Sequence, residues 1–371
     1  METQYKLYPL LLSRIFLMKV WGSNSIRWAM KREIDDLPRI GELWETYDGD
    51  NGSVITNGKY RLRSLSEMVQ EFQQALLGDR LKEYVNRPFP LLIKYLFPSQ
   101  ALSVQVHPDD EYAMKHENSN GKEEMWVVLE AKPESFIIVG WKEGLTKQDI
   151  TASIADRKFN DIMNVVHPEP GQVFYIPPGS IHALGPGLAI LEIQQNSDIT
   201  YRIYDWDRPD ESGKFRDLHI EKALQVLDFT HTPQYHISPL VVNHGGGDCR
   251  FLCACSHFAA CMWDIRAKIE MESDRGAFWI FNVISGSGKI VRGDSWDDQP
   301  LEQGDTVVIP AHMGPFTVEP SDFSMRIVKS WLPDLFNDII SPLRQAGFCD
   351  SDIIGLGGYK IKNDIKSALQ V

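Results

Sequence analysis

Cysteine is scarce in this sequence, and the few cysteines follow no disulfide pattern. Five are spread over 371 residues, an odd number without the spacing of a small disulfide scaffold. This usage is typical of a reducing compartment, so we expect a cytoplasmic protein. The apolar run at residues 7–12 is short, is broken by Pro9 and has no small-residue cleavage pattern after it. It therefore does not predict a signal peptide.

Long apolar runs and an excess of positive charge are also missing. No stretch approaches the ~20 consecutive apolar residues that a membrane span needs. Lys and Arg number 38 against 51 Asp and Glu, and the formal net charge is −13. Because nucleic acids and anionic membrane surfaces both select for basic faces, we expect neither as a partner. A phosphate-bearing ligand would need positive charge concentrated locally.

The pattern of apolar residues favours a mainly β protein. Most apolar segments are short and are bounded by Gly or Pro, which is typical of strands and turns. We predict helices at 64–85, where apolar residues recur at three-to-five spacing behind a possible Ser64 cap, at 146–163 behind Thr146, and at 218–227. The interval 233–239 is predicted to be a linker.

An internal repeat predicts two copies of one β-barrel unit. The segment 304–310 repeats the form of 171–177, and 278–281 repeats 125–128. At this length two domains are also the default expectation. We expect a metal-binding barrel with N-terminal strands and a helix at 1–235, a second, metal-free barrel at 236–340, and a tail of loop and short helix at 341–371.

Four side chains of the first predicted barrel form a candidate metal site. Gln105 and His107 are two apart on a predicted strand, so both side chains point to the same face. A strand opening at Glu124 can bring a carboxylate beside them, and the Ile-Pro-Pro-Gly turn delivers His182. This mixed nitrogen and oxygen set suits Zn²⁺, with Fe²⁺ or Mn²⁺ as alternatives. In the repeat, Ala277 and Pro315 take the positions of Glu124 and His182, which is why the second barrel is expected to bind no metal.

Four segments in order resemble one enzyme family. They are Ser103-Val-Gln-Val-His-Pro-Asp-Asp-Glu-Tyr-Ala113, Gly121-Lys-Glu-Glu-Met-Trp126, Pro177-Pro-Gly-Ser-Ile-His-Ala-Leu184 and Gln195-Asn-Ser-Asp-Ile-Thr-Tyr-Arg202. Together they resemble the type I mannose-6-phosphate isomerases of the cupin superfamily, in their shorter bacterial form. The resemblance covers about residues 16–333. It is incomplete at Gly41-Glu-Leu-Trp-Glu-Thr-Tyr47 and does not extend to the tail.

The resemblance implies a fold, a reaction and a set of site residues. It implies two cupin-type β-barrels and one Zn²⁺ per chain, held by the four candidate ligands, with the family spacing selecting Glu124 over Glu123. It implies an interconversion of mannose 6-phosphate and fructose 6-phosphate, a hexose phosphate partner, and a monomer or homodimer. The remaining site residues that it implies are Lys122, Asp198 and Arg202, with Glu192 on the strand where the family carries a carboxylate.

We assign these residues provisional roles. Glu192 is the candidate for the carboxylate that moves the proton. Lys122 lies two residues before Glu124 and so faces the same way, towards the substrate. Arg202, positioned by Asp198, would stabilise negative charge on oxygen, although a purely structural ion pair with Asp198 or Asp205 is the alternative. Outside the site, Cys253 and Cys255 are interpreted as small core side chains.

Two other function classes stay open from the sequence alone. A non-catalytic, regulatory cupin could keep the metal and bind a sugar or sugar phosphate without turnover. A metal-dependent cupin dioxygenase would require Fe²⁺ and oxygen. Lys122 and Arg202 beside the metal ligands favour an anionic sugar over an apolar dioxygenase substrate.

Overall fold

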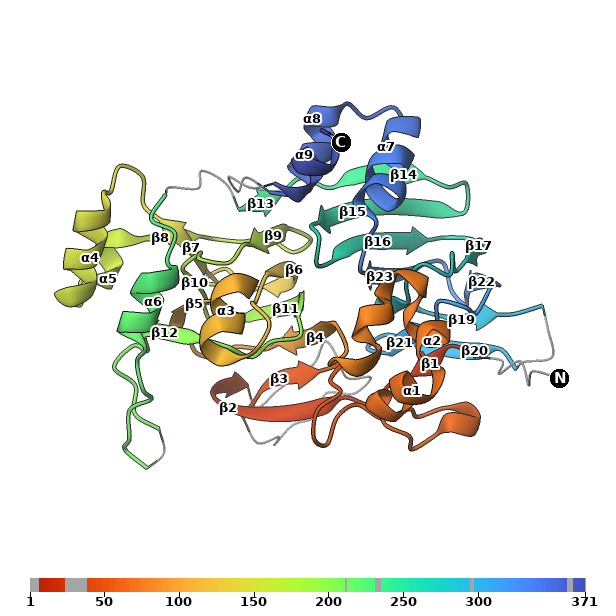
Figure 1. Ribbon diagram of the computed structural model, residues 1–371, viewed down its shortest axis with the longest axis horizontal. Coiled ribbons are helices and arrows are strands. Elements are labelled where there is room, and N and C mark those ends of the chain that lie inside the picture. Colours follow the sequence, from red (N-terminus) through yellow and green to blue (C-terminus); the bar gives the residue numbers. More distant parts are fainter. Residues whose placement is uncertain are drawn as a thin grey trace.

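The fold is mainly β, as predicted, and its strands form two units that lie side by side (Figure 1). The computed structural model describes residues 7–23, 39–210, 212–230, 235–293, 297–358 and 363–370. The strands of these ranges form four sheets in which every pairing between named strands is antiparallel. No helix in the described part of the chain is long and apolar enough to cross a membrane.

The first unit has a sheet of seven strands and a sheet of five. The seven strands, in spatial order, are β13 (His236–Ile237), β9 (Val173–Ile176), β6 (Glu124–Ala131), β11 (Leu188–Gln195), β4 (Leu91–Leu96), β3 (Ile40–Trp44) and β2 (Ile15–Ser23). The five are β12 (Tyr201–Tyr204), β5 (Val104–Val106), β10 (His182–Leu184), β7 (Ile137–Trp141) and β8 (Met163–Val166). The predicted linker at 233–239 adds β13 to the larger sheet, and residues 231–234 lie outside the described ranges.

The second unit has a sheet of seven strands and a sheet of four. The seven are β1 (Leu10–Leu11), β21 (Thr306–Ile309), β18 (Trp279–Ser285), β23 (Met325–Trp331), β16 (Ala259–Ile265), β15 (Gly247–Ala254) and β14 (Leu240–Asn243). The four are β17 (Ile269–Glu272), β22 (Pro315–Pro320), β19 (Ser287–Val291) and β20 (Gln299–Glu302). The N-terminal strand β1 thus pairs with β21, about 300 residues away. The sequence repeat is visible in the pairing, since β6 pairs with β9 as β18 pairs with β21.

The helices are short and lie at the edges of the two units. They are η1 (Gly58–Tyr60), α1 (Leu65–Phe72), α2 (Gln74–Leu77), η2 (Asp79–Asn86), α3 (Asp110–Glu117), α4 (Lys147–Ala155), α5 (Phe159–Ile162), α6 (Ile220–Val226), η3 (Leu335–Ile340), α7 (Ser341–Gln345), α8 (Asp350–Gly355) and α9 (Asp364–Ala368). Helix α3 was not predicted. It begins after the turn at Pro108, where Asp109 accepts a hydrogen bond from the backbone of Tyr112 and caps the helix.

The single helix predicted at 64–85 is wrong and is replaced by three short ones. Ser64 caps α1 as predicted, in a capping box with Glu67. The helix then breaks at Gln73 (φ 47°) and at Gly78 (φ 113°). A Cβ on Gly78 would lie 2.2 Å from the backbone oxygen of Gly276 in the second unit. Glycine is therefore required there, because the segment packs directly on another part of the chain.

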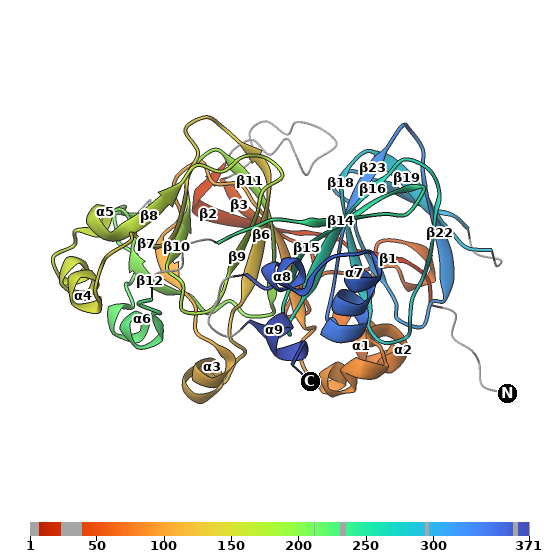
Figure 2. The ribbon, with the colours of Figure 1, turned by 90° about the horizontal axis from the view of Figure 1, so that it is seen from above.

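The described part of the C-terminal tail contains three short helices where one was predicted. Helices α8 and α9 lie over the junction of the two units (Figure 2). The oxygen of Leu356 accepts a hydrogen bond from Ala254 of β15, and Gly358 packs on the ring of Tyr175 in β9. The tail therefore contacts both units.

Three strands of the first unit are buried on both faces, and the two faces differ in character. On β4, β6 and β11 the odd-numbered side chains, such as Tyr95, Val127 and Leu191, share one hydrophobic cluster with Phe278 and Phe281 of the second unit. The even-numbered side chains face the interior of the first unit, where a second cluster lies. This interior face carries the polar residues described next.

Candidate metal centre and active site

Strand pairing brings the four predicted metal ligands together. His182, at the start of β10, lies directly opposite Gln105 on β5. His107 follows β5 immediately, and its backbone oxygen accepts a hydrogen bond from Gly179 in the turn before His182. Glu124 reaches the group from β6 in the facing sheet. The two histidines and Glu124 form a compact group of buried side chains that could hold a metal ion.

The spacing of the donor atoms fits a divalent metal. Glu124 Oε1 lies 3.3 Å from His182 Nε2, and Glu124 Oε2 lies 3.6 Å from His107 Nε2. Two ligands at the usual zinc distances of ~2.0–2.2 Å in tetrahedral geometry are about 3.3 Å apart. Both carboxylate oxygens of Glu124 are buried; Oε2 has the ammonium of Lys122 at 3.1 Å, whereas Oε1 has no hydrogen-bond partner among the described residues. A buried carboxylate oxygen that faces only the lone pair of an imidazole is costly unless a metal cation lies between the two atoms.

Backbone carbonyls fix the orientation of both histidines. His107 Nδ1 lies 2.7 Å from the oxygen of Ile199, and His182 Nδ1 lies 3.0 Å from the oxygen of Ser180. A carbonyl oxygen only accepts, so each Nδ1 carries the proton and each Nε2 directs its lone pair towards Glu124. Burial lowers the pKa of His182 to about 4 and, together with Lys122, holds the pKa of His107 well below its usual value. Both imidazoles are therefore neutral, as metal binding requires.

Gln105 completes the set. Its side-chain nitrogen lies 3.3 Å from His182 Nε2. Rotating the amide by half a turn leaves its shape unchanged and presents the oxygen to the same point, where an amide oxygen is a suitable ligand. The donor set is then two nitrogens and two or three oxygens.

Gln105, alone among the four predicted ligands, lines a cavity of about 260 Å³ that is rich in cations. Its lining includes all four residues predicted for catalysis. Five of its lining side chains are cationic, and two of these, Lys122 and Arg202, are among the predicted catalytic residues. These cations are Lys19, Lys94, Lys122, Arg202 and Arg216; the carboxylates are Glu42, Glu192 and Asp198. A chain with net charge −13 thus concentrates positive charge at this point.

Lys122 lies directly beside the metal ligands. Its Nζ is 3.1 Å from Glu124 Oε2 and 3.2 Å from His107 Nε2, and the residue is buried. Burial alone would lower the pKa of Lys122, but the carboxylates of Glu124 and Glu192 outweigh it and raise the pKa. The lysine is therefore held as a cation on the interior face, where its strand position predicted it.

Glu192 is a buried carboxylate with two partners. Oε1 accepts a hydrogen bond of 3.0 Å from the indole of Trp126, and Oε2 lies 3.6 Å from Nζ of Lys94. Burial and the charge of Glu124 raise the pKa of Glu192. In register, Glu192 lies opposite both Trp126 and Lys94, so the three side chains stand side by side on the interior face.

The predicted pairing of Arg202 with Asp198 is wrong among the described residues. Arg202 donates to the backbone oxygen of Asp217 at 2.9 Å, and its Nε is buried without a hydrogen-bond partner in the described structure. Asp198 instead lies 3.8 Å from Lys94, with two thirds of its side chain exposed. Asp205 pairs with Arg208 and Arg216 and not with Arg202. Arg202 lies opposite Gln105 across the strands.

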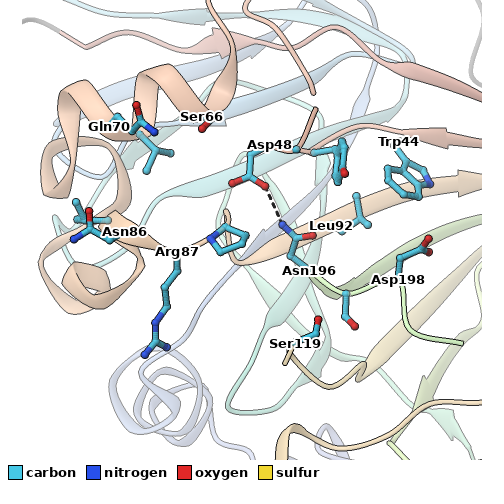
Figure 3. Close-up of a pocket in the computed structure, with 16 residues that line it drawn as sticks. Trp44, Asp48, Ser66, Gln70, Asn86, Arg87, Leu92, Ser119, Asn196 and Asp198 are labelled. Atoms are coloured by element: carbon cyan, nitrogen blue, oxygen red, sulfur yellow. Dashed lines mark hydrogen bonds between the residues drawn. The ribbon is translucent and has the colours of Figure 1, made fainter. Parts of the chain in front are cut away.

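A larger cavity of about 680 Å³ adjoins this one (Figure 3). Asp198 lines both cavities. In the larger one, Asn196 donates a hydrogen bond of 3.1 Å to Asp48, and Arg87 lies on the side away from Trp44 (Figure 3). Gln105 and the four residues predicted for catalysis line the smaller cavity, which is therefore the candidate active site.

Sequence reasoning missed Lys94, Glu42 and Trp126 as parts of this site. Lys94 is the only charged residue in β4, whose six residues are all buried. A lone lysine inside an apolar strand was a usable signal, because lysine is rarely fully buried without a partner. The partner itself, Glu192, is almost 100 residues away and carries no local signal.

Comparison with known proteins gives the family. A model described as phosphomannose isomerase type I, catalytic domain, matches residues 10–145, and one described as mannose-6-phosphate isomerase, cupin domain, matches residues 248–331. The chain is 34% identical over 319 residues to mannose-6-phosphate isomerase ManA of Bacillus subtilis (strain 168), which covers 84% of this chain and 96% of that protein.

Solved structures agree with this assignment. A crystal structure of mannose 6-phosphate isomerase from Bacillus subtilis superposes with a TM-score of 0.77 at 32% identity, covering 87% of this chain and 99% of the other. A zinc-bound mannose 6-phosphate isomerase, 17% identical, shares the fold with a TM-score of 0.67, covering 87% of this chain and 99% of that one. The chain belongs to the type I mannose-6-phosphate isomerase family.

Proposed function

We propose that this chain interconverts mannose 6-phosphate and fructose 6-phosphate at the cavity lined by Gln105, Lys122, Glu192 and Arg202. The relatives that carry this name support the reaction. The single observation that supports it most is the placement of Glu192, a buried carboxylate of raised pKa, in the same cationic cavity as Gln105 and as Lys122, which contacts Glu124 and His107. An aldose–ketose isomerase needs both: a group that moves a proton between two carbons and a means to stabilise charge on the neighbouring oxygens.

We propose one Zn²⁺ per chain, held by Gln105, His107, Glu124 and His182. The neutral imidazoles, the buried Glu124 Oε1 that has no hydrogen-bond donor among the described residues, and the donor spacing of 3.3 and 3.6 Å support it, and the zinc-bound relative agrees. When bound, the metal would supply a Lewis acid for the hydroxyl and carbonyl oxygens of the open-chain sugar. All four donors come from the first unit; in the second, Trp279 pairs with Ile309 of β21 as Glu124 pairs with Ile176 of β9, so a tryptophan stands where the first unit has the carboxylate.

Glu192 is the proposed proton carrier. It would take a proton from C2 of the aldose and return it to C1 through an enediolate. The indole of Trp126 holds one oxygen of Glu192 in place, and Lys94 lies near the other. Burial raises the pKa of Glu192, and a carboxylate of raised pKa is a stronger base.

Lys122 and Arg202 would stabilise the negative charge that develops on the sugar oxygens. Both are cations at the cavity, and Arg202 Nε has no hydrogen-bond partner among the described residues, so it is available to an oxygen of the ligand. Lys19 and Arg216 at the same cavity are suited to the phosphate group. Asp198, paired with Lys94, would act on the position of that lysine rather than on Arg202.

The same proposal includes the domain organisation. Residues 1–235 would form the catalytic unit, 236–340 a supporting unit without this metal site, and 341–371 a helical tail across their junction. None of the five cysteines, which all lie in the described ranges, forms a disulfide, and this supports the proposed cytoplasmic location.

A coupled assay tests the reaction directly. Purified chain with one equivalent of zinc should convert mannose 6-phosphate to fructose 6-phosphate, and chelation should abolish turnover until metal is restored. Unphosphorylated mannose serves as the control for the phosphate-binding cations. Metal-loaded chain that binds mannose 6-phosphate without turnover would refute the enzyme proposal.

A further inference from the structure

A second cluster of metal-donor side chains lies behind the first, at the junction of the two units. Glu123 immediately precedes β6 of the first unit, whereas Cys255 and His257 lie in the turn between β15 and β16 of the second. One donor atom from each of the three side chains lies within 4.8 Å of the other two. Glu123 and Cys255 are buried, and 29% of the His257 side chain is exposed. We propose that these three residues bind a second divalent metal ion that joins the two units.

The orientation of His257 supports this site. Its Nδ1 lies 2.6 Å from Glu123 Oε2, on the side of the three donors, while its Nε2 lies 3.0 Å from Asp110 Oδ2. Histidines that bind metals commonly donate their second N–H to a carboxylate, which fixes the ring. Asp110 is itself held by the backbone of Gly121 at 2.7 Å and by Gln195 at 3.0 Å.

Hydrogen bonds hold the turn that carries Cys255 and His257, one across the turn itself and two to the C-terminal tail. The backbone of Cys255 donates to Phe258 at 2.8 Å. Ser256, between the two donors, binds Asp364 at the start of α9 through both its backbone nitrogen and its hydroxyl, each at 2.9 Å. The C-terminal tail therefore holds the Cys-x-His pair in position, and such a preformed pair lowers the entropy cost of binding.

The donor types select the class of metal. A thiolate, an imidazole and a carboxylate suit Zn²⁺ or a similar borderline-soft divalent ion, whereas Mg²⁺ and Ca²⁺ prefer oxygen alone. Three protein ligands leave the fourth tetrahedral position for water, and the exposed part of His257 offers an entry path. The site is separate from the position in the second unit that corresponds to Glu124 of the first metal site, where the strand register places Trp279.

Metal binding requires a change in geometry at this cluster. The 2.6 Å between His257 Nδ1 and Glu123 Oε2 must widen to about 3.3 Å to admit a tetrahedral ion. In the first site the donor atoms already lie 3.3 and 3.6 Å apart. This cost makes the second site the weaker of the two, so it fills after the first.

Cobalt(II) distinguishes the two sites because only the second contains sulfur. Metal-depleted full-length chain titrated with Co²⁺ should take up two equivalents. A thiolate-to-cobalt charge-transfer band in the near ultraviolet should appear only with the second. Cys255→Ser should lose the band and the second equivalent, while Cys253→Ser, which removes another buried thiol on the adjoining strand, should retain both. Isomerase activity should depend on the first equivalent alone. The absence of a second bound equivalent would therefore contradict this site without contradicting the proposed reaction, and the absence of activity would do the reverse.

Two results would overturn the second site. One is uptake of a single equivalent without a sulfur band; the other is a band that survives Cys255→Ser. If Cys255→Ser does not fold, Glu123→Gln removes a ligand while preserving shape, and it should likewise reduce the uptake from two equivalents to one. Unchanged uptake in that variant would equally contradict the site.

Discussion

Replacing Glu192 by Gln separates the chemistry of the site from its stability. The amide still accepts the hydrogen bond from the indole of Trp126, but it cannot take up a proton from carbon. A positioned base contributes ~10²–10⁴-fold to the rate, so kcat should fall by that factor. Zinc content should stay the same, because Glu192 is not among the proposed ligands.

The same change leaves Lys94 as a buried cation with a weaker partner. At 3.6 Å and an effective dielectric constant of about 20, the lost attraction is about 5 kcal/mol before solvation is considered. Asp198 at 3.8 Å and the ring of Trp44 at 4.9 Å retain part of the stabilisation. We therefore expect a loss of roughly 2–4 kcal/mol, in the range for breaking a buried ion pair.

A double variant distinguishes the two effects. The variant that combines Glu192→Gln with Lys94→Met removes the unpaired charge. The midpoint of its thermal unfolding (Tm) should therefore lie above that of Glu192→Gln alone, while its kcat should remain low. Glu45→Gln is the matched control, because Glu45 is an equally buried carboxylate outside the cavity, bound by Thr306 at 2.7 Å. It should lower the midpoint and keep turnover. If zinc-loaded Glu192→Gln retained more than a tenth of the wild-type kcat, Glu192 would not be the base.

Three further predictions follow from the geometry of the site. His182→Ala should lose its zinc, measured by elemental analysis, together with all turnover, whereas His236→Ala should keep both; an active, zinc-free His182→Ala would contradict the ligand set. Since the cation of Lys94 lowers the pKa of Glu192, Lys94→Met should raise that pKa further. The base works only when ionised, so the acid limb of kcat/KM should move to higher pH, and a shift to lower pH would contradict the assignment. Arg202→Lys keeps the charge but loses the planar fork, and kcat should fall by ~10²-fold with little change in thermal midpoint; an unchanged kcat would remove Arg202 from the mechanism.

The part of the site that could be predicted depends on short-range geometry. Alternation along a strand places Gln105 and His107 on one face and separates Glu123 from Glu124, and neither inference needs the rest of the fold. The structure places Glu123 beside His257 and Glu124 beside His182, as that alternation predicts. The confirmed prediction of a mainly β fold also rests on a local pattern, because most apolar segments are short and are bounded by Gly or Pro.

The parts that could not be predicted depend on segments far apart in sequence. Asp198 and Arg202 are close in sequence, which suggested an ion pair between them. In the structure the guanidinium of Arg202, on β12, instead donates a hydrogen bond to the backbone oxygen of Asp217. Similarly, the helix at 64–85 is interrupted because Gly78 packs on Gly276, a contact that no local pattern reveals. His257 showed no partner in the sequence because both of its carboxylates lie more than 130 residues away.

The second unit contributes to the site without supplying any of the four proposed ligands. The odd-numbered residues of β4, β6 and β11 pack in one hydrophobic cluster with Phe278 and its neighbours, while the even-numbered residues include Lys94, Glu124 and Glu192. A register slip of one residue on any of these strands would turn its charged side chain into that cluster. Burying one unpaired charge there costs several kcal/mol, a large fraction of the stability of a typical domain. The apolar contact between the units therefore fixes the strand register, and that register aligns the metal ligands with the proposed base.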